Sequence, residues 1–156
     1  MQIHPFEPIY DENSKILILG SFPSVRSRAD GFYYGHPQNR FWKVLSFLLN
    51  EEMPKTNEEK RALLLRSGIA LWDVIASCEI ENSSDSTIRQ AKPNDLSEIF
   101  KTADIRRVYT NGKTADRLYR KYHEREAVCL PSTSPANAAW TLERLQRAWQ
   151  VILETE

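Results

Sequence analysis

The sequence predicts an α/β fold: a single domain over residues 1–156, with a central, mainly parallel four-stranded sheet and helices on both faces. Short apolar, β-branched runs alternate along the chain with segments whose apolar residues recur every three or four positions. Such alternation with short connections is typical of parallel strands joined by right-handed helical crossovers. With 156 residues, of which 41% are hydrophobic and 27% charged, the chain is long and apolar enough to fold alone.

Four runs are the expected strands. Residues 15–20, Lys-Ile-Leu-Ile-Leu-Gly, form a continuous apolar stretch that indicates a strand buried on both faces. The other three are residues 69–72, 105–110 and 127–130. Ligands of parallel sheets bind beyond the carboxyl ends of the strands. The loops expected at that edge are residues 20–39, 73–86 and 131–137.

Helices are expected in the intervals between these strands. The first has its opening turn at residues 37–40 and one apolar stripe, made of Phe41, Val44, Leu45 and Leu48. Others are expected to begin at Asn57 and near residues 94–95 and 112–113. Ser134-Pro135, a cap followed by proline, predicts the start of the last helix. Its apolar stripe is Ala138, Leu142, Leu145, Trp149 and Ile152.

The composition excludes several classes of protein. Lys plus Arg equals Asp plus Glu at 21 each, so any contact with DNA must be local. Cys78 and Cys129, expected to be buried, and three scattered histidines lack the spacing of a metal site, so we expect neither metal nor cofactor. No apolar run has the length of a membrane span and no signal-peptide pattern opens the chain. We expect a cytoplasmic monomer with no membrane partner.

The chemistry-bearing residues gather in three motifs: GSFPS at residues 20–24, GFYYGHPQNRFW at 31–42 and LPSTSPAN at 130–137. The first two resemble the GINPG loop and HPANRFW-like segment of mismatch-specific uracil-DNA glycosylases. The third resembles the Pro-Ser loop by which the uracil-DNA glycosylase superfamily enters the minor groove. Together they most closely resemble the hypoxanthine-DNA glycosylase (DNA-deoxyinosine glycosylase) branch. The resemblance implies a repair enzyme that hydrolyses the glycosidic bond of a flipped, deaminated base in damaged DNA and leaves an abasic site.

One departure from the mismatch-specific pattern bears on catalysis. Phe22 stands where those enzymes place a catalytic Asn, and the water-activating Asp of ordinary uracil glycosylases is also absent. The resemblance implies that Asn39 replaces them. An amide suffices chemically, because an oxocarbenium-like transition state needs a placed water and a stabilised leaving base more than a strong base. The alternative is that Asn39 only caps its helix.

The resemblance also implies a base pocket. Tyr34 matches a Phe that stacks on the extruded base, and Asp73 falls where many relatives have an Asn that hydrogen-bonds to the edge of the base. A carboxylate there accepts from N1–H of hypoxanthine. Ser21 and Phe22 complete this pocket. The alternatives are a core aromatic for Tyr34 and a helix cap for Asp73.

A phosphate grip is expected from Ser132, Thr133 and Ser134, at the start of the last helix, where the helix dipole favours an anion. Asn111 and Lys113 are expected to add an N–H donor and a cation for the DNA backbone. The alternative for both groups is ordinary turn chemistry.

Two rival functions are open at this stage. One is a superfamily member that prefers uracil in mismatches, since uracil shares the imino N–H of hypoxanthine beside a carbonyl. The other is a non-catalytic α/β module that binds a nucleotide or phosphate, although GSFPSV matches neither phosphate-loop signature. For a glycosylase, the lack of Lys within the three motifs predicts monofunctional hydrolysis without a Schiff base.

Overall fold

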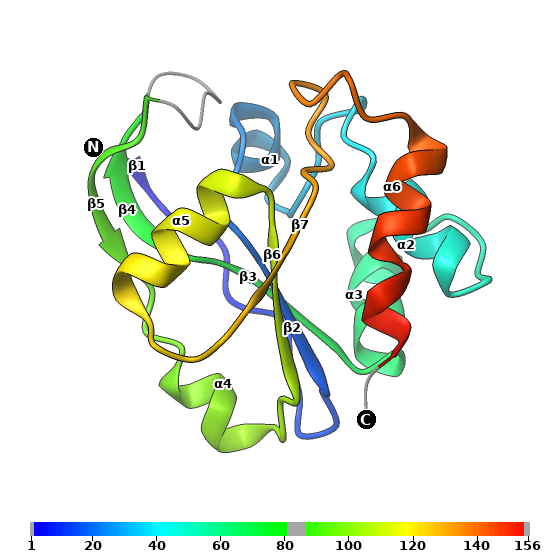
Figure 1. Cartoon of the computed structure of the whole chain (residues 1–156), viewed down its shortest axis with the longest axis horizontal. Helices are drawn as coiled ribbons and strands as arrows, with labels where there is room; N and C mark the ends of the chain where they lie inside the picture. Colours follow the sequence, from blue (N-terminus) through cyan, green and yellow to red (C-terminus); the bar gives the residue numbers. More distant parts are fainter. Residues whose placement is uncertain (1, 81–86, 155–156) are drawn as a thin grey trace.

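The computed structural model describes residues 2–80 and 87–154 and contains the expected four-stranded parallel sheet (Figure 1). The strand order is β3-β2-β6-β7, and each neighbouring pair is parallel. The strands are β2 (Ile16–Gly20), β3 (Ile69–Asp73), β6 (Arg107–Asn111) and β7 (Val128–Leu130). All four predicted strands are therefore confirmed, with bounds shifted by one or two residues.

Helices cover both faces of this sheet, as predicted (Figure 1). One face carries α2 (Phe41–Leu48), α3 (Asn57–Arg66) and α6 (Leu142–Trp149), and the other carries α4 (Ser97–Thr102) and α5 (Lys113–Tyr122). A short helix, α1 (Val25–Asp30), lies in the first loop, and a 3₁₀ turn (Gln150–Leu153) follows α6.

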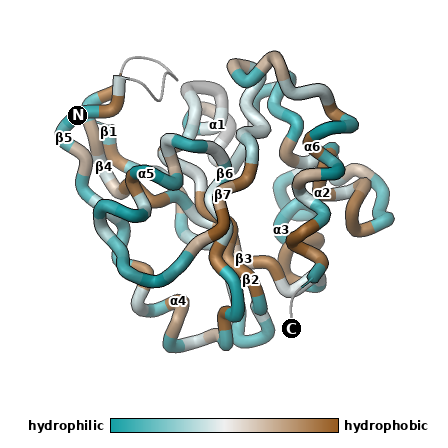
Figure 2. Tube along the Cα trace, viewed as in Figure 1, coloured by the Kyte–Doolittle hydropathy of each residue, from teal (hydrophilic) through white to brown (hydrophobic). Residues whose placement is uncertain are grey.

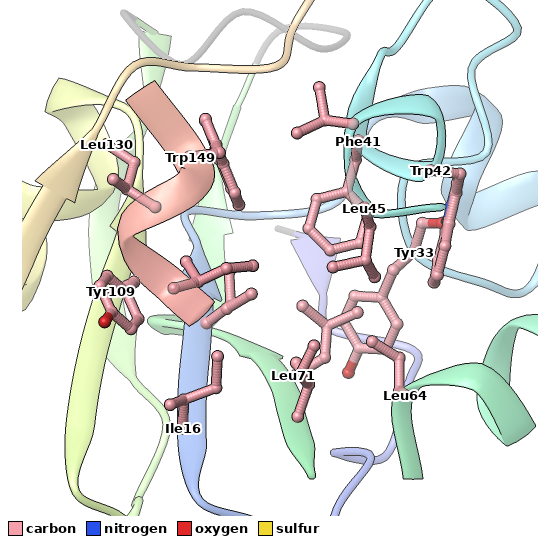
Figure 3. Close-up of a cluster of buried hydrophobic side chains, with 14 of the residues drawn as sticks. Ile16, Tyr33, Phe41, Trp42, Leu45, Leu64, Leu71, Tyr109, Leu130 and Trp149 are labelled. Atoms are coloured by element: carbon pink, nitrogen blue, oxygen red, sulfur yellow. Dashed lines mark hydrogen bonds between the residues drawn. The ribbon is translucent and has the colours of Figure 1, made fainter. Parts of the chain in front are cut away.

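Alternate side chains of β2 build the two halves of the core. Ile16 and Ile18 pack with the α2, α3 and α6 side (Figure 3), whereas Leu17 and Leu19 pack with α4 and α5. This alternation follows from the two-residue period of a strand. Strands β2 and β3 are coloured hydrophobic at the centre of the molecule (Figure 2), and the residues of β2 are all buried.

A second sheet was not predicted. It is antiparallel, with order β1-β4-β5, and its strands are β1 (Gln2–Ile3), β4 (Ile75–Glu79) and β5 (Arg89–Pro93). The expectation of a loop over residues 73–86 is thus wrong for its first half, and residues 81–86 lie outside the described part of the chain. Because β1 pairs with β4, the N-terminal segment is held against the carboxyl end of β3.

The last helix begins later than predicted. Its first residue is Leu142, capped by the Thr141 side chain, and residues 134–140 form turns. The guanidinium of Arg40 donates to backbone carbonyl oxygens of Ser134, Asn137 and Trp140, which ties this segment down as a loop. The expected helix start at Ser134-Pro135, and with it the anion site at that helix terminus, is therefore wrong. Of the predicted stripe, Leu145, Trp149 and Ile152 are buried and Leu142 is half-buried, whereas Ala138 is exposed and precedes the helix.

Candidate active site

A cavity of about 740 Å³ lies at the carboxyl ends of β2, β3, β6 and β7. The loops that follow β2, β6 and β7 line it together with Asp73 at the end of β3, as expected for a parallel sheet. Every site residue predicted from the sequence lines this one cavity: Ser21, Phe22, Tyr34, Asn39, Asp73, Asn111, Lys113, Ser132, Thr133 and Ser134.

The carbonyl oxygen of the Asn39 side chain is fully engaged. It accepts from the backbone N–H of Phe41 at 2.9 Å and from the hydroxyl of Thr133 at 2.9 Å. A backbone N–H only donates, so this contact fixes which amide atom is the oxygen. Asn39 lines the cavity, and its Nδ2 donates to no acceptor among the described residues. Asn39 is not the N-cap of α2, which is Arg40, but its oxygen binds the first N–H of that helix from the preceding position, and the amide N–H groups remain as donors.

Thr133 is held in place by Asn111. Its hydroxyl accepts from Asn111 Nδ2, and its backbone N–H donates to Asn111 Oδ1, both at 3.0 Å. Thr133 is fully buried, and its carbonyl oxygen accepts from the Arg40 backbone N–H. A chain of hydrogen bonds therefore runs from Asn111 at the end of β6, through Thr133, to Asn39 before α2. Sequence reasoning missed this chain, because partners separated by 22 and 94 residues leave no local signal.

Asp73 is the last residue of β3 and is 3% exposed. Strand β4 follows after one residue, so the interpretation of Asp73 as a helix cap is wrong. Its Oδ2 lies 2.7 Å from Nε2 of His4, a residue that sequence reasoning did not select. Its Oδ1 lies over Gly20: a β-carbon at position 20 would overlap this oxygen and come within 2.9 Å of the Tyr34 hydroxyl. Gly20 thereby lets both polar groups approach the sheet edge.

Tyr34 and its neighbour Tyr33 have different surroundings. Tyr33 is buried and donates its hydroxyl to the Glu7 carbonyl oxygen at 2.9 Å. Burial, and secondly the charge of Asp73, raise the pKa of Tyr33, which stays a neutral phenol. Tyr34 lines the cavity and stacks on Phe41, with ring centroids 4.2 Å apart. The core interpretation therefore fits Tyr33, whereas Tyr34 borders the cavity.

The Ser-rich loop contains the turn chemistry offered as the alternative. Ser132 Oγ accepts from the Ser134 N–H, and Ser134 Oγ accepts from the Ala136 N–H, each at 3.1 Å. The start of α5 lies beside this loop, because a β-carbon on Gly112 would come 3.0 Å from that of Ser132. Lys113, the first residue of α5, is exposed. The helix N-terminus at the carboxyl edge of the sheet is therefore that of α5, whereas the sequence predicted that of the last helix.

The two cysteines differ. Cys78 is buried as expected, but Cys129 is exposed and lines the cavity, so the expectation of a buried thiol is wrong for it. Partial covering of the sulfur, and secondly the charge of Asp116, raise the pKa of the Cys129 thiol. At neutral pH the group is thus a thiol and a poor nucleophile.

Within residues 2–80 and 87–154, no group of three or more His, Cys, Asp or Glu side chains is arranged to hold a metal ion. No helix in the same ranges combines the length and apolarity that crossing a membrane requires.

The fold and the cavity define an α/β protein with an aromatic ring, a carboxylate and an amide donor gathered at the carboxyl edge of a parallel sheet. A sequence profile described as the uracil DNA glycosylase superfamily matches residues 7–153. The chain belongs to this superfamily.

Named relatives agree with this placement. A hypoxanthine DNA glycosylase of Methanosarcina acetivorans is 34% identical over 152 residues, which cover 94% of this chain and 95% of the relative. One of Methanosarcina barkeri is 37% identical over 115 residues, covering 72% and 73%. The solution NMR structure of a candidate uracil DNA glycosylase from M. acetivorans has a TM-score of 0.78 at 32% identity, covering 97% of this chain and 99% of that one.

Proposed function

We propose that the protein is a monofunctional DNA glycosylase that excises hypoxanthine from deoxyinosine in damaged DNA and leaves an abasic site. The observation that carries this proposal is the single cavity that Asn39, Tyr34 and Asp73 line together. The superfamily assignment and the two relatives named hypoxanthine DNA glycosylase support the reaction and the base.

The pocket side chains suit a flipped, deaminated purine. The Asp73 carboxylate accepts a hydrogen bond from N1–H of hypoxanthine, a donor that replaces the bare N1 of adenine. Tyr34 stacks on the base with the ring face that Phe41 does not cover. Ser21 and Phe22, both buried at the end of β2, form the floor of the pocket.

Asn39 acts in this account as a hydrogen-bond donor. Its carbonyl oxygen already accepts two hydrogen bonds, so this oxygen has no free lone pair with which to orient a water molecule. Its Nδ2 donates to the departing base, where negative charge grows as the glycosidic bond breaks. An oxocarbenium-like sugar then reacts with water without a strong base.

Fewer residues are assigned to phosphate binding than the sequence predicted. We assign Ser132, Ser134, Lys113 and the N-terminus of α5 to the flipped nucleotide's phosphate. Asn111 and Thr133 are engaged with each other, and we assign them to the support of Asn39. With a net charge of zero, binding depends on these local contacts. The enzyme acts as a monomer on nucleoid DNA inside the cell.

Uracil in mismatches is the second candidate substrate. Its N3–H beside a carbonyl presents the same hydrogen-bond pattern to Asp73, and only ring size separates the two bases. A non-catalytic nucleotide-binding module has less support, because the chain belongs to a superfamily of glycosylases.

The test is single-turnover base release from labelled duplexes that carry hypoxanthine, uracil, xanthine or a thymine mismatch, followed by alkaline cleavage. We expect hypoxanthine to be released fastest and the abasic strand to stay intact before alkali. Because Lys113 lines the cavity, borohydride is added during turnover in a parallel reaction. A trapped protein–DNA adduct would contradict hydrolysis without a Schiff base, and faster release of uracil would contradict the assigned base.

A further inference from the structure

His4 comes from the N-terminal segment, outside the three motifs, yet it contacts the side chain proposed to bind the edge of the base. Its Nε2 lies 2.7 Å from Asp73 Oδ2, across 69 residues of sequence. The two side chains are 3% and 4% exposed. Asp73, which lines the cavity, thus forms a buried imidazole–carboxylate pair with His4.

The imidazole ring is fixed on its other side as well. Nδ1 lies 3.2 Å from the backbone N of Phe6 and 3.0 Å from its carbonyl oxygen. The backbone N–H of His4 donates to the Ala76 carbonyl oxygen. Aromatic rings surround it at centroid distances of 5.3 to 6.4 Å: Phe6, Phe22, Tyr33 and Trp72. This packing holds the ring with Nε2 toward Asp73, the carboxylate that it contacts.

We propose that His4 is a positioning residue that sets base specificity through Asp73, an inference that rests on the proposed contact between Asp73 and N1–H. A buried carboxylate oxygen lacks water and needs a hydrogen-bond donor beside it. The Nε2–H of His4 supplies that donor at Oδ2. The other oxygen, Oδ1, lies above Gly20, and because Asp73 lines the cavity, Oδ1 is the acceptor assigned to the base.

The acceptor role of Asp73 matters because the competing base is adenine. Hypoxanthine presents N1–H, which a carboxylate oxygen accepts, whereas adenine presents a bare N1 lone pair, which that oxygen repels. An Asp73 side chain that is free to rotate presents no fixed acceptor to either base. By donating to Oδ2, His4 holds Oδ1 in place as that acceptor, so that Asp73 selects against the undamaged base.

The experiment compares wild type, His4→Ala, Asp73→Asn and the double variant in single-turnover release and in binding of hypoxanthine and adenine duplexes. An Asn side chain has one oxygen, so it cannot accept from His4 and from N1–H with two separate oxygens as the carboxylate does. We expect His4→Ala to slow hypoxanthine release by roughly tenfold or more. We also expect it to lower the ratio of hypoxanthine binding to adenine binding. In the Asp73→Asn background the same change should have little effect on either measurement. His4→Gln, whose amide can donate to Oδ2, should restore part of the loss.

An equal effect of His4→Ala in both backgrounds would overturn the inference, because a ring that only supports packing matters equally with Asp or Asn at position 73. Thermal unfolding of each variant measures that packing contribution separately. Failure of the proposed function gives a different result: wild type then prefers another base, and the same four proteins are compared on that base. Where release is too slow to measure, duplex binding supplies the comparison.

Discussion

The hydroxyl of Thr133 donates to the side-chain carbonyl of Asn39 at 2.9 Å, although the two residues are 94 positions apart. This contact joins the loop after β7 to the start of α2. Together with the Phe41 N–H it occupies both lone pairs of the Asn39 oxygen, so the amide nitrogen is the group left for chemistry. The loop that resembles a DNA-gripping motif therefore also orients the proposed catalyst.

Thr133→Val should lower base release, because the isosteric methyl group cannot donate to Asn39. Valine also leaves Asn111 Nδ2 without its acceptor, which costs about 1–3 kcal/mol of folding free energy. We expect a roughly tenfold or greater loss in single-turnover rate in the folded variant. Thr133→Ser keeps the hydroxyl and serves as the control. Equal rates in the valine and serine variants would show that Asn39 does not depend on this hydrogen bond.

Gly20→Ala should inactivate the enzyme, because the new β-carbon overlaps Asp73 Oδ1 and crowds the Tyr34 hydroxyl. Both side chains must then shift away from the base pocket. Gly31→Ala is the control: its φ of 75° is unfavourable for alanine, but no atom lies within 4 Å of the new carbon. Activity per folded molecule should survive at position 31 and be lost at position 20. Retained hypoxanthine release in Gly20→Ala would argue against the assignment of Asp73 and Tyr34.

Lys113→Ala should weaken binding to every duplex alike and should reduce the slope of log affinity against log salt by about one. The physical reason is the loss of one phosphate contact at the start of α5. Lys15→Ala, at the opposite edge of the sheet before β2, should leave the slope unchanged. An unchanged slope in Lys113→Ala would remove this residue from the phosphate grip.

Cys129 offers a probe of cavity occupancy. Because its pKa is raised, the reactive thiolate is scarcer at pH 8 than in an ordinary cysteine, and alkylation should speed up as pH rises through the raised pKa. Hypoxanthine-containing duplex should protect Cys129, since it lines the cavity, and mass spectrometry of the alkylated protein reports this. Buried Cys78 is the internal control and should stay unmodified. Alkylation at the same rate with and without DNA would place the bound duplex elsewhere.

The parallel sheet was predictable because its signal is local: β2 is a run of apolar residues buried on both faces. The antiparallel sheet was not predictable, because β5 (Arg89–Pro93) is mostly exposed and polar. Its strand conformation comes from pairing with β4 and not from a local apolar pattern. The start of α6 was misplaced for a related reason. Ser134-Pro135 has the chemistry of a helix cap, but three carbonyl oxygens of residues 134–140 are bound by Arg40, which is remote in sequence.

Site residues with a local sequence signal were predictable, whereas those placed by contacts between distant parts of the chain were not. Asn39 and Tyr34 follow from the motifs and Asp73 from its place after the predicted strand 69–72; all three line one cavity, and the roles proposed for them await the tests above. His4 belongs to no motif and to no periodic apolar pattern. Its contact with Asp73 arises because the pairing of β1 with β4 brings the N-terminal segment to the end of β3. The direction of the Asn39 amide likewise depends on Thr133, a contact invisible in the linear sequence.

The central claim is that Asn39 acts through its amide N–H groups, and single-turnover release of hypoxanthine by Asn39→Ala and Asn39→Asp tests it most directly. Alanine removes the donor and aspartate keeps only oxygens, so both variants should bind the lesion duplex yet lose about a hundredfold or more in rate. Asn39→Gln, which retains an amide at a longer reach, is the matched control for the chemistry. Near-normal release by Asn39→Ala would refute the catalytic assignment, and substantial activity in Asn39→Asp alone would show that an oxygen, and not the amide donor, does the work.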